Sequence, residues 1–187
     1  MFDVALIDQY LGLASVAMQV LGVGFLALYF LRSKFADLGD ISSLLEKWGM
    51  WLAFLLTLGS AAMTLFYSEI LGFAPCGLCW LQRVFLYPQV FLFAVALWKQ
   101  DRRVADYSIV LSTVGVIVAL YQHYLQMGGT DVIPCPATGV TGGGITADCA
   151  QRFFFEFGYI TFPLMSAVLF AFLIVLMLFV RSRRTTL

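Results

Sequence analysis

The chain has 187 residues, of which 61% are hydrophobic and only 12% are charged. This composition excludes an ordinary soluble domain and predicts a protein that is built into a membrane. The eleven basic and eleven acidic residues leave no formal net charge, and no nucleic-acid partner is implied.

Five apolar stretches are long enough to cross a hydrocarbon core of about 30 Å as helices, which takes roughly 20 residues each. They cover approximately residues 11–31, 48–67, 82–98, 105–125 and 160–180. The predicted fold class is therefore an all-α integral membrane protein. Polar residues inside the spans are few, and they lie near the span ends: Gln82, Arg83, Gln89, Gln122 and His123. This argues against a pump or an ion-coupled transporter, which usually keeps ionisable residues near the membrane midplane.

Basic residues gather on one side of the predicted membrane. Nine of the eleven follow the first, third or fifth span: Arg32, Lys34, Lys47, Lys99, Arg102, Arg103, Arg181, Arg183 and Arg184. By the positive-inside rule this side is the cytoplasm, so the C-terminus is cytoplasmic. The N-terminus and all four cysteines then lie on the extracytoplasmic side. We expect the first span to be an anchor with its N-terminus outside rather than a signal peptide, because acidic residues precede it and basic residues follow it.

The first cysteine pair, Cys76-Gly-Leu-Cys79, stands at the start of the third apolar span. Pro75 breaks the preceding segment, so we expect Cys79 near the first turn of a helix, where unpaired N–H groups stabilise a thiolate. Arg83 follows Cys79 by four residues and would share its helix face, which brings a positive charge close. The alternative is a structural thiol pair beside an Arg83 that only reaches toward the membrane interface.

The second pair, Cys135 and Cys149, lies in a Gly-rich loop. The thirteen residues between them leave slack for a bridge within the pair or for either cysteine to reach elsewhere. Pro134 and Pro136 favour an extended segment around Cys135, which could present its sulfur to a partner protein. A structural disulfide remains possible, and so does a zinc site made of all four cysteines, although only the first pair has the close spacing of zinc ligands. Disulfides persist in oxidising extracytoplasmic compartments, which favours thiol chemistry.

These residues carry a resemblance to a known family. The segment YSEILGFAPCGLCWLQRVFLYP, residues 67–88, resembles the signature of the bacterial disulfide bond formation protein DsbB, particularly its BdbC-like branch. Residues 121–126 are similar to the end of that family's third helix, and residues 157–164 resemble the start of its fourth. The similarity covers about residues 48–180. It is specific, because a CxxC motif followed by Arg at the outer end of a span is joined by a second cysteine pair in the matching loop.

The resemblance implies a four-helix transmembrane bundle, residues 48–187, in the bacterial cytoplasmic (inner) membrane. Such a protein reoxidises a DsbA-like thioredoxin-fold oxidase and passes the electrons to the membrane quinone pool, with ubiquinone or menaquinone as cofactor. We expect no metal site. Membrane lipid would surround the bundle.

The resemblance also implies roles for individual residues. Cys135 would form the mixed disulfide with the partner, and Cys149 would be its mate in a redox-active disulfide. A second redox-active disulfide, Cys76–Cys79, would accept the electrons by exchange. The residues implied to contact the quinone are Cys79, Arg83 and His123.

Residues 1–47 depart from the family pattern, because they add an extra N-terminal transmembrane helix and a cytoplasmic linker. We expect this helix to be a simple anchor, and the alternatives are a dimer contact or a cover for the quinone site. Residues 151–157 are rich in Phe and are compatible either with an interfacial helix or with packing at the entry of the following helix. The functional alternatives are an enzyme similar to vitamin K epoxide reductase, in which the loop pair precedes the CxxC, a membrane protein stapled by disulfides, and a metal-binding membrane module.

Overall fold

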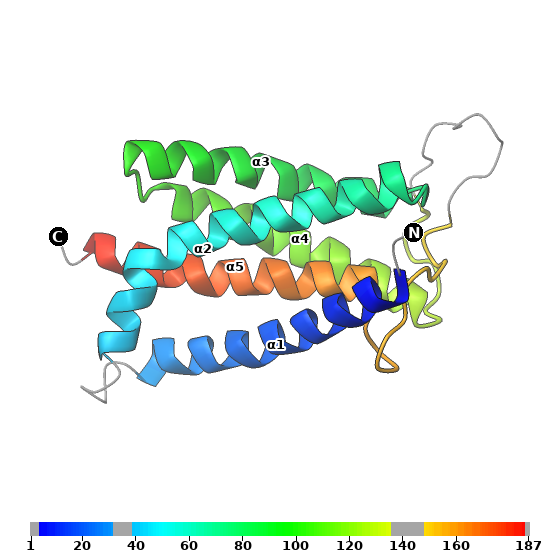
Figure 1. Ribbon diagram of the computed structural model, residues 1–187, viewed down its shortest axis with the longest axis horizontal. Helices are drawn as coiled ribbons and strands as arrows, with labels where there is room; N and C mark the ends of the chain where they lie inside the picture. The colour runs from blue at the N-terminus through cyan, green and yellow to red at the C-terminus, as the bar shows by residue number, and fades with distance from the viewer. Residues whose placement is uncertain (1–3, 32–38, 136–147, 186–187) are drawn as a thin grey trace.

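The structure is a computed structural model that describes residues 4–31, 39–135 and 148–185. Its five long helices run side by side in alternating directions (Figure 1). They are α1 (Val4–Leu31), α2 (Gly39–Leu65), α3 (Gly77–Lys99), α4 (Val104–Gln126) and α5 (Phe162–Thr185), and α2 continues into the short π-helix η2 (Phe66–Ile70). Each long helix contains an apolar segment that is long enough to cross a membrane. The predicted all-α membrane fold with five spans is confirmed.

Helix α5 is the centre of the bundle, because α1, α2 and α4 all pack against it. Its side chains fill the core, including Phe170, Leu173, Leu176, Met177 and Phe179. Helix α1, the additional helix, lies along one side of this bundle (Figure 1). It contacts α5 through Phe25 against Phe172, with ring centroids 5.8 Å apart, and through Tyr29 against Phe179 at 5.4 Å. The four helices α2 to α5 therefore form the bundle, and α1 is added to its surface.

Two helices begin earlier than hydropathy predicts. Helix α1 starts at Val4 rather than near residue 11, and α2 starts at Gly39 rather than near residue 48. The first turns of α2 mix apolar residues with polar and charged ones, including Ser42, Glu46 and Lys47. An average over a window that includes these residues falls below that of a membrane span, although the helix is continuous.

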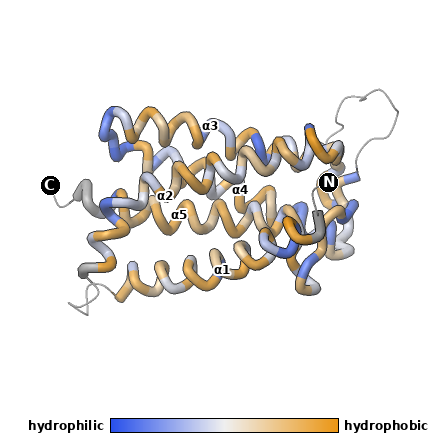
Figure 2. Tube along the Cα trace, viewed as in Figure 1, coloured by the Kyte–Doolittle hydropathy of each residue, from blue (hydrophilic) through white to orange (hydrophobic). Residues whose placement is uncertain are grey.

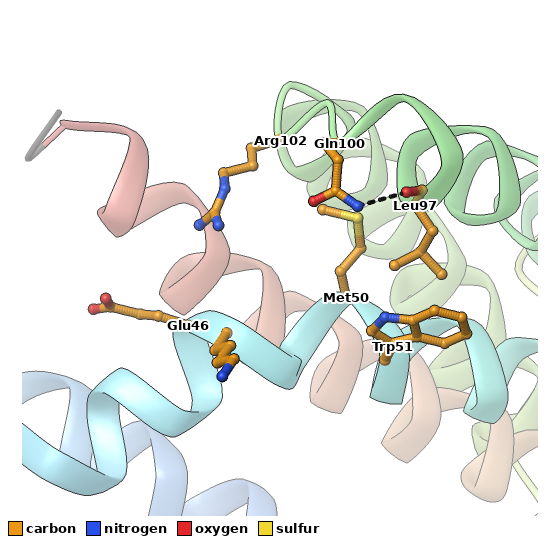
Figure 3. Close-up of a pocket in the computed structure, with 7 residues that line it drawn as sticks. Glu46, Met50, Trp51, Leu97, Gln100 and Arg102 are labelled. Atoms are coloured by element: carbon orange, nitrogen blue, oxygen red, sulfur yellow. Dashed lines mark hydrogen bonds between the residues drawn. The ribbon is translucent and has the colours of Figure 1, made fainter.

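Hydrophilic residues gather at both ends of the bundle, and the helices between the ends are mainly hydrophobic (Figure 2). The cysteines belong to one end, where α3 and α5 begin and α2 and α4 finish. Lys47, Lys99, Arg102, Arg103 and Arg181 belong to the other end, whereas Arg83 and Arg152 lie toward the cysteine end. A pocket of about 60 Å³ at this basic end is lined by Lys47, Trp51, Gln100 and Arg102 among others (Figure 3). Because it lies at the end opposite the cysteines, this pocket is not part of their site.

The interpretation of residues 151–157 as an interfacial helix is wrong. The chain turns back on itself there, and Glu156 pairs with Ile160 in an antiparallel bridge. Phe157 and Gly158 have φ angles of 52° and 77°, which a right-handed helix does not allow. Phe154 is buried against Phe162, with ring centroids 4.8 Å apart, so it packs inside the protein rather than in lipid.

Candidate active site

The first cysteine pair caps the N-terminus of α3. Cys76 is the N-cap residue, with an extended backbone, and its sulfur accepts a hydrogen bond from the backbone N–H of Cys79 at 3.4 Å. Cys79 follows in the first turn, as the sequence predicts. Both cysteines are thiols, and their sulfur atoms are 2.8 Å apart. The pair therefore lies at the positive end of the helix dipole, where anionic sulfur is favoured.

Two buried glutamines adjoin these sulfurs. Nε2 of Gln122, on α4, is 3.1 Å from Sγ of Cys76 and 3.1 Å from Sγ of Cys79. Gln82, on α3, donates from Nε2 to Oε1 of Gln122 at 2.6 Å. Gln122 is 1% exposed and Gln82 is 7% exposed, so water does not compete for these bonds. The sequence marked both glutamines only as polar residues near span ends and missed their contact with the cysteines.

Cys76 lies just before the membrane-spanning segment of α3 and holds its proton more tightly than an ordinary cysteine. The hydrogen bond with the Cys79 sulfur, followed by burial, raises the pKa of Cys76 above its ordinary value. Either sulfur can be the donor in the contact between Cys76 and Cys79, and the raised pKa favours Cys76 as the donor. The Cys79 sulfur also accepts a hydrogen bond from Gln122.

Arg83 lies one turn further along α3 and is part of the protein interior, at 8% exposure. Its Nη2 donates to the backbone carbonyl of Thr64, near the end of α2, at 2.9 Å. Its guanidinium carbon lies 5.1 Å from the centre of the Trp80 ring. The interpretation of Arg83 as a side chain that only reaches toward the interface does not match this placement.

His123 is half-buried near the end of α4. Its Nδ1 lies 2.9 Å from Oγ1 of Thr161, which is fully buried just before α5. Oγ1 of Thr161 also accepts from the backbone N–H of Leu164 at 3.4 Å. His123 therefore joins α4 to the start of α5, and its contact with a quinone stays a prediction.

The second pair is a disulfide, Cys135–Cys149, with its Cα atoms 5.9 Å apart. Helix α4 holds the chain on both sides of this bridge. The hydroxyl of Tyr121 donates to the carbonyl of Ile133 at 2.7 Å and accepts from the N–H of Ile133 at 2.8 Å. Nε2 of Gln126 donates to the carbonyl of Gln151 at 3.0 Å. The central part of the loop, residues 136–147, with the glycine run, lies outside the described residues.

All four cysteines belong to one hydrophobic cluster. Its buried members are Cys76, Leu78, Leu125 and Cys149, with Cys79, Val118, Tyr121 and Cys135 packed against them. The two cysteine pairs that the sequence predicts to act together are thus brought together, one as a dithiol and one as a disulfide. A thiol and a disulfide in one cluster are the reactants of thiol–disulfide exchange. Fold and site together define a multi-pass membrane protein of the thiol–disulfide oxidoreductase class.

Comparison with known proteins leads to the family. The family described as "Disulfide bond formation protein DsbB" matches residues 46–180, and the chain belongs to this family. It is a protein-disulfide oxidoreductase of the membrane. Helix α1 precedes the matched region.

The chain is similar to several curated relatives. It is 37% identical over 135 residues to the SPbeta prophage-derived disulfide bond formation protein B of Bacillus subtilis (strain 168), covering 71% of this chain and 86% of that protein. It is 36% identical over 126 residues to the probable disulfide formation protein C of Bacillus cereus, covering 67% and 82%. The probable disulfide formation protein of Metapseudomonas resinovorans is 35% identical over 139 residues, covering 72% and 89%. No solved structure matches the chain.

Proposed function

We propose that this protein oxidises a DsbA-like thioredoxin-fold partner and passes the electrons to a membrane quinone. The observation that carries the proposal is the single cluster that holds a disulfide, Cys135–Cys149, and a dithiol, Cys76 and Cys79. Two pairs in series supply what exchange requires, an accessible target sulfur, an attacking thiolate and a resolving cysteine at each step.

The first step transfers two electrons from the partner. A thiolate of the partner attacks Sγ of Cys135, which breaks the Cys135–Cys149 bond and forms a mixed disulfide. The second thiol of the partner then displaces Cys135, so the partner leaves as a disulfide and the loop pair becomes a dithiol. Two protons leave the partner's thiols, and two are taken up by the loop cysteines.

The second step moves the same two electrons into the first pair. The loop dithiol exchanges with a Cys76–Cys79 disulfide, which restores the Cys135–Cys149 bond and leaves Cys76 and Cys79 as thiols. The disulfide between Cys135 and Cys149 and the two free cysteines Cys76 and Cys79 are compatible with this step.

The quinone, ubiquinone or menaquinone, would be held beside Cys79 by Arg83, with His123 as a second contact. When bound, a quinone accepts two electrons and two protons and leaves as the quinol. The residues fit such a group, because the guanidinium of Arg83 is buried and has five N–H donors, of which the bond to Thr64 uses one. A spare donor of this kind can hydrogen-bond a ring oxygen of the quinone.

We also propose how the protein is oriented in the membrane and how the chain divides into functional segments. The basic end of the bundle faces the cytoplasm of the bacterial inner membrane with the C-terminus, and the N-terminus and the four cysteines face outward. Residues 48–187 form the catalytic unit, and residues 1–47 are an accessory segment. A thiol reagent that does not cross membranes should then label the reduced cysteines of intact spheroplasts, and protection of all four would contradict this sidedness.

The test is stopped-flow absorbance at the quinone band with purified protein, a reduced thioredoxin-fold dithiol and a water-soluble quinone. We expect consumption of the dithiol that depends on quinone and is abolished by Cys79→Ser. Cys135→Ser is the matched variant. It should abolish oxidation of the folded partner, yet leave oxidation of dithiothreitol, a small dithiol that can reach the first pair directly. Full quinone reduction by Cys79→Ser would refute the proposal.

A further inference from the structure

We infer that Gln122 and Gln82 set the redox equilibrium of the Cys76–Cys79 pair by stabilising its reduced form. Gln122 binds the two sulfurs, and Gln82 is a positioning residue that fixes the orientation of the Gln122 amide. The inference rests on the proposed redox role of the pair, and it adds two residues to the site that neither charge nor a cysteine motif identifies.

The contacts form a chain with one direction. Gln82 donates to Oε1 of Gln122 at 2.6 Å, so the other end of that amide, Nε2, faces the sulfurs. The two hydrogens of Nε2 serve two acceptors, Cys76 Sγ and Cys79 Sγ, each at 3.1 Å. The reversed amide would place a carbonyl oxygen against an electron-rich sulfur, which is repulsive.

These hydrogen bonds discriminate between the two redox states. A thiolate is an anionic acceptor, whereas a disulfide sulfur is neutral and accepts hydrogen bonds weakly. Gln122 therefore stabilises the reduced pair more than the oxidised pair, and burial of both glutamines increases the difference because the local dielectric constant is low. A reduced form that is stabilised in this way makes the disulfide a stronger oxidant. The CxxC disulfide then accepts electrons from the loop pair more readily.

The alternative is that Gln82 and Gln122 only hold α3 against α4, because another buried glutamine makes hydrogen bonds between the same two helices. Gln89, on α3, is fully buried and accepts from Ser108 at 2.7 Å and from Ser112 at 3.2 Å, both on α4. Its bonds are thus of the same interhelical type as the Gln82–Gln122 bond. Gln89 lies seven residues, or about two helical turns, beyond Gln82 and is a matched control for loss of a buried interhelical amide.

The experiment equilibrates the full-length protein in detergent with mixtures of reduced and oxidised dithiothreitol, without quinone and without a partner protein. Each dithiothreitol that closes to its cyclic disulfide gives two electrons and two protons to one protein disulfide. The thiols are then trapped by alkylation, and the Cys76–Cys79 and Cys135–Cys149 pairs are read separately by peptide mass spectrometry.

We expect Gln122→Met, which keeps the side-chain length but removes the donors, to shift the equilibrium of the first pair toward the disulfide by about tenfold or more. A tenfold shift corresponds to a potential about 30 mV more negative. Gln82→Met should shift it in the same direction by less, because Gln122 remains but its amide can turn. Gln89→Met should leave the equilibrium unchanged.

An unchanged equilibrium in a folded Gln122→Met protein would overturn the inference. So would an equal shift in Gln89→Met, which would assign the effect to helix packing. If Gln122→Met does not fold, Gln82→Met decides by the same criterion. The quinone assay tests the proposed function separately, since a wild-type protein without quinone turnover can still show these shifts.

Discussion

The contact of α4 with α5 at Gly115 allows a prediction of both the sign and the size of a mutational effect. A Cβ atom at residue 115 would lie 2.7 Å from Cε2 of Phe170 and 2.8 Å from its Cδ2 and Cζ atoms. Phe170 is 1% exposed, so its ring has no open space to turn into. Close helix contacts of this kind use small residues because the backbones approach each other.

Gly115→Ala should therefore destabilise the protein. Overpacking a well-packed core costs about 1–3 kcal/mol. Replacing Gly by Ala inside a helix returns roughly 0.5–1 kcal/mol of helix propensity. The difference is a net loss of about 0–2.5 kcal/mol in the free energy of unfolding.

The assay is reversible unfolding in mixed micelles, followed by circular dichroism, with Gly59→Ala as the control. At Gly59, on α2, no heavy atom of the described residues outside its local backbone lies within 4 Å of an added Cβ. This variant should gain roughly 0.5–1 kcal/mol from helix propensity alone. The two substitutions are chemically identical and should have opposite signs. If Gly115→Ala is as stable as Gly59→Ala, the tight contact with Phe170 does not exist as described.

Three further predictions follow from single contacts. Tyr121→Phe removes both hydrogen bonds to Ile133 and should slow oxidation of the partner about threefold to tenfold, the equivalent of one neutral hydrogen bond; an unchanged stopped-flow rate would show that this tether is irrelevant. Asp8→Ala removes the acceptor of the Tyr67 hydroxyl and should lower the free energy of unfolding by about 1–3 kcal/mol. In a double-mutant cycle, Tyr67→Phe should then be much less destabilising in the Asp8→Ala protein than in the wild type. The raised pKa of Cys76 means that the folded state retains the proton longer than the unfolded state, so stability is fully present below the ordinary pKa of about 9 and declines as the pH rises above it. Unfolding of the reduced protein across this pH range should show the decline, and Cys76→Ser should lose it.

The sequence predicted the transmembrane architecture because hydropathy is a local property. Each of the five apolar stretches is a helix, since lipid leaves a spanning chain no other way to satisfy its backbone alone. The start of α2 was predicted too late because its first turns mix polar with apolar residues, and the start of α1 because a polar residue there is accommodated by a distant contact. Asp8 lies ahead of the predicted span, and its carboxylate accepts a hydrogen bond from Tyr67 on η2. A contact between residues 59 positions apart leaves no local signal.

The site was predictable to the extent that its residues follow one another along the chain. The N-terminal position of Cys79 on a helix follows from Pro75 and from the apolar run that comes next. Gln82 could have been suspected, because it lies three residues after Cys79 and so near the same helix face. Gln122 could not, since it comes from α4, and only the packing of α4 on α3 brings its amide to the sulfurs.

The contacts of α1 extend beyond those of a simple anchor. Its Asp8 binds Tyr67 of η2, the segment that leads toward the first cysteine pair. The Tyr67 ring in turn packs against Phe162 at the start of α5, with ring centroids 4.9 Å apart, and against Phe73 at 6.1 Å. Phe162 follows Thr161, the hydrogen-bond partner of His123. Through the buried Tyr67, helix α1 is therefore connected both to the segment before the CxxC pair and to the junction that holds His123. Removal of α1 would thus disturb the packing at the cysteine end of the bundle as well as the surface of α5 that α1 covers.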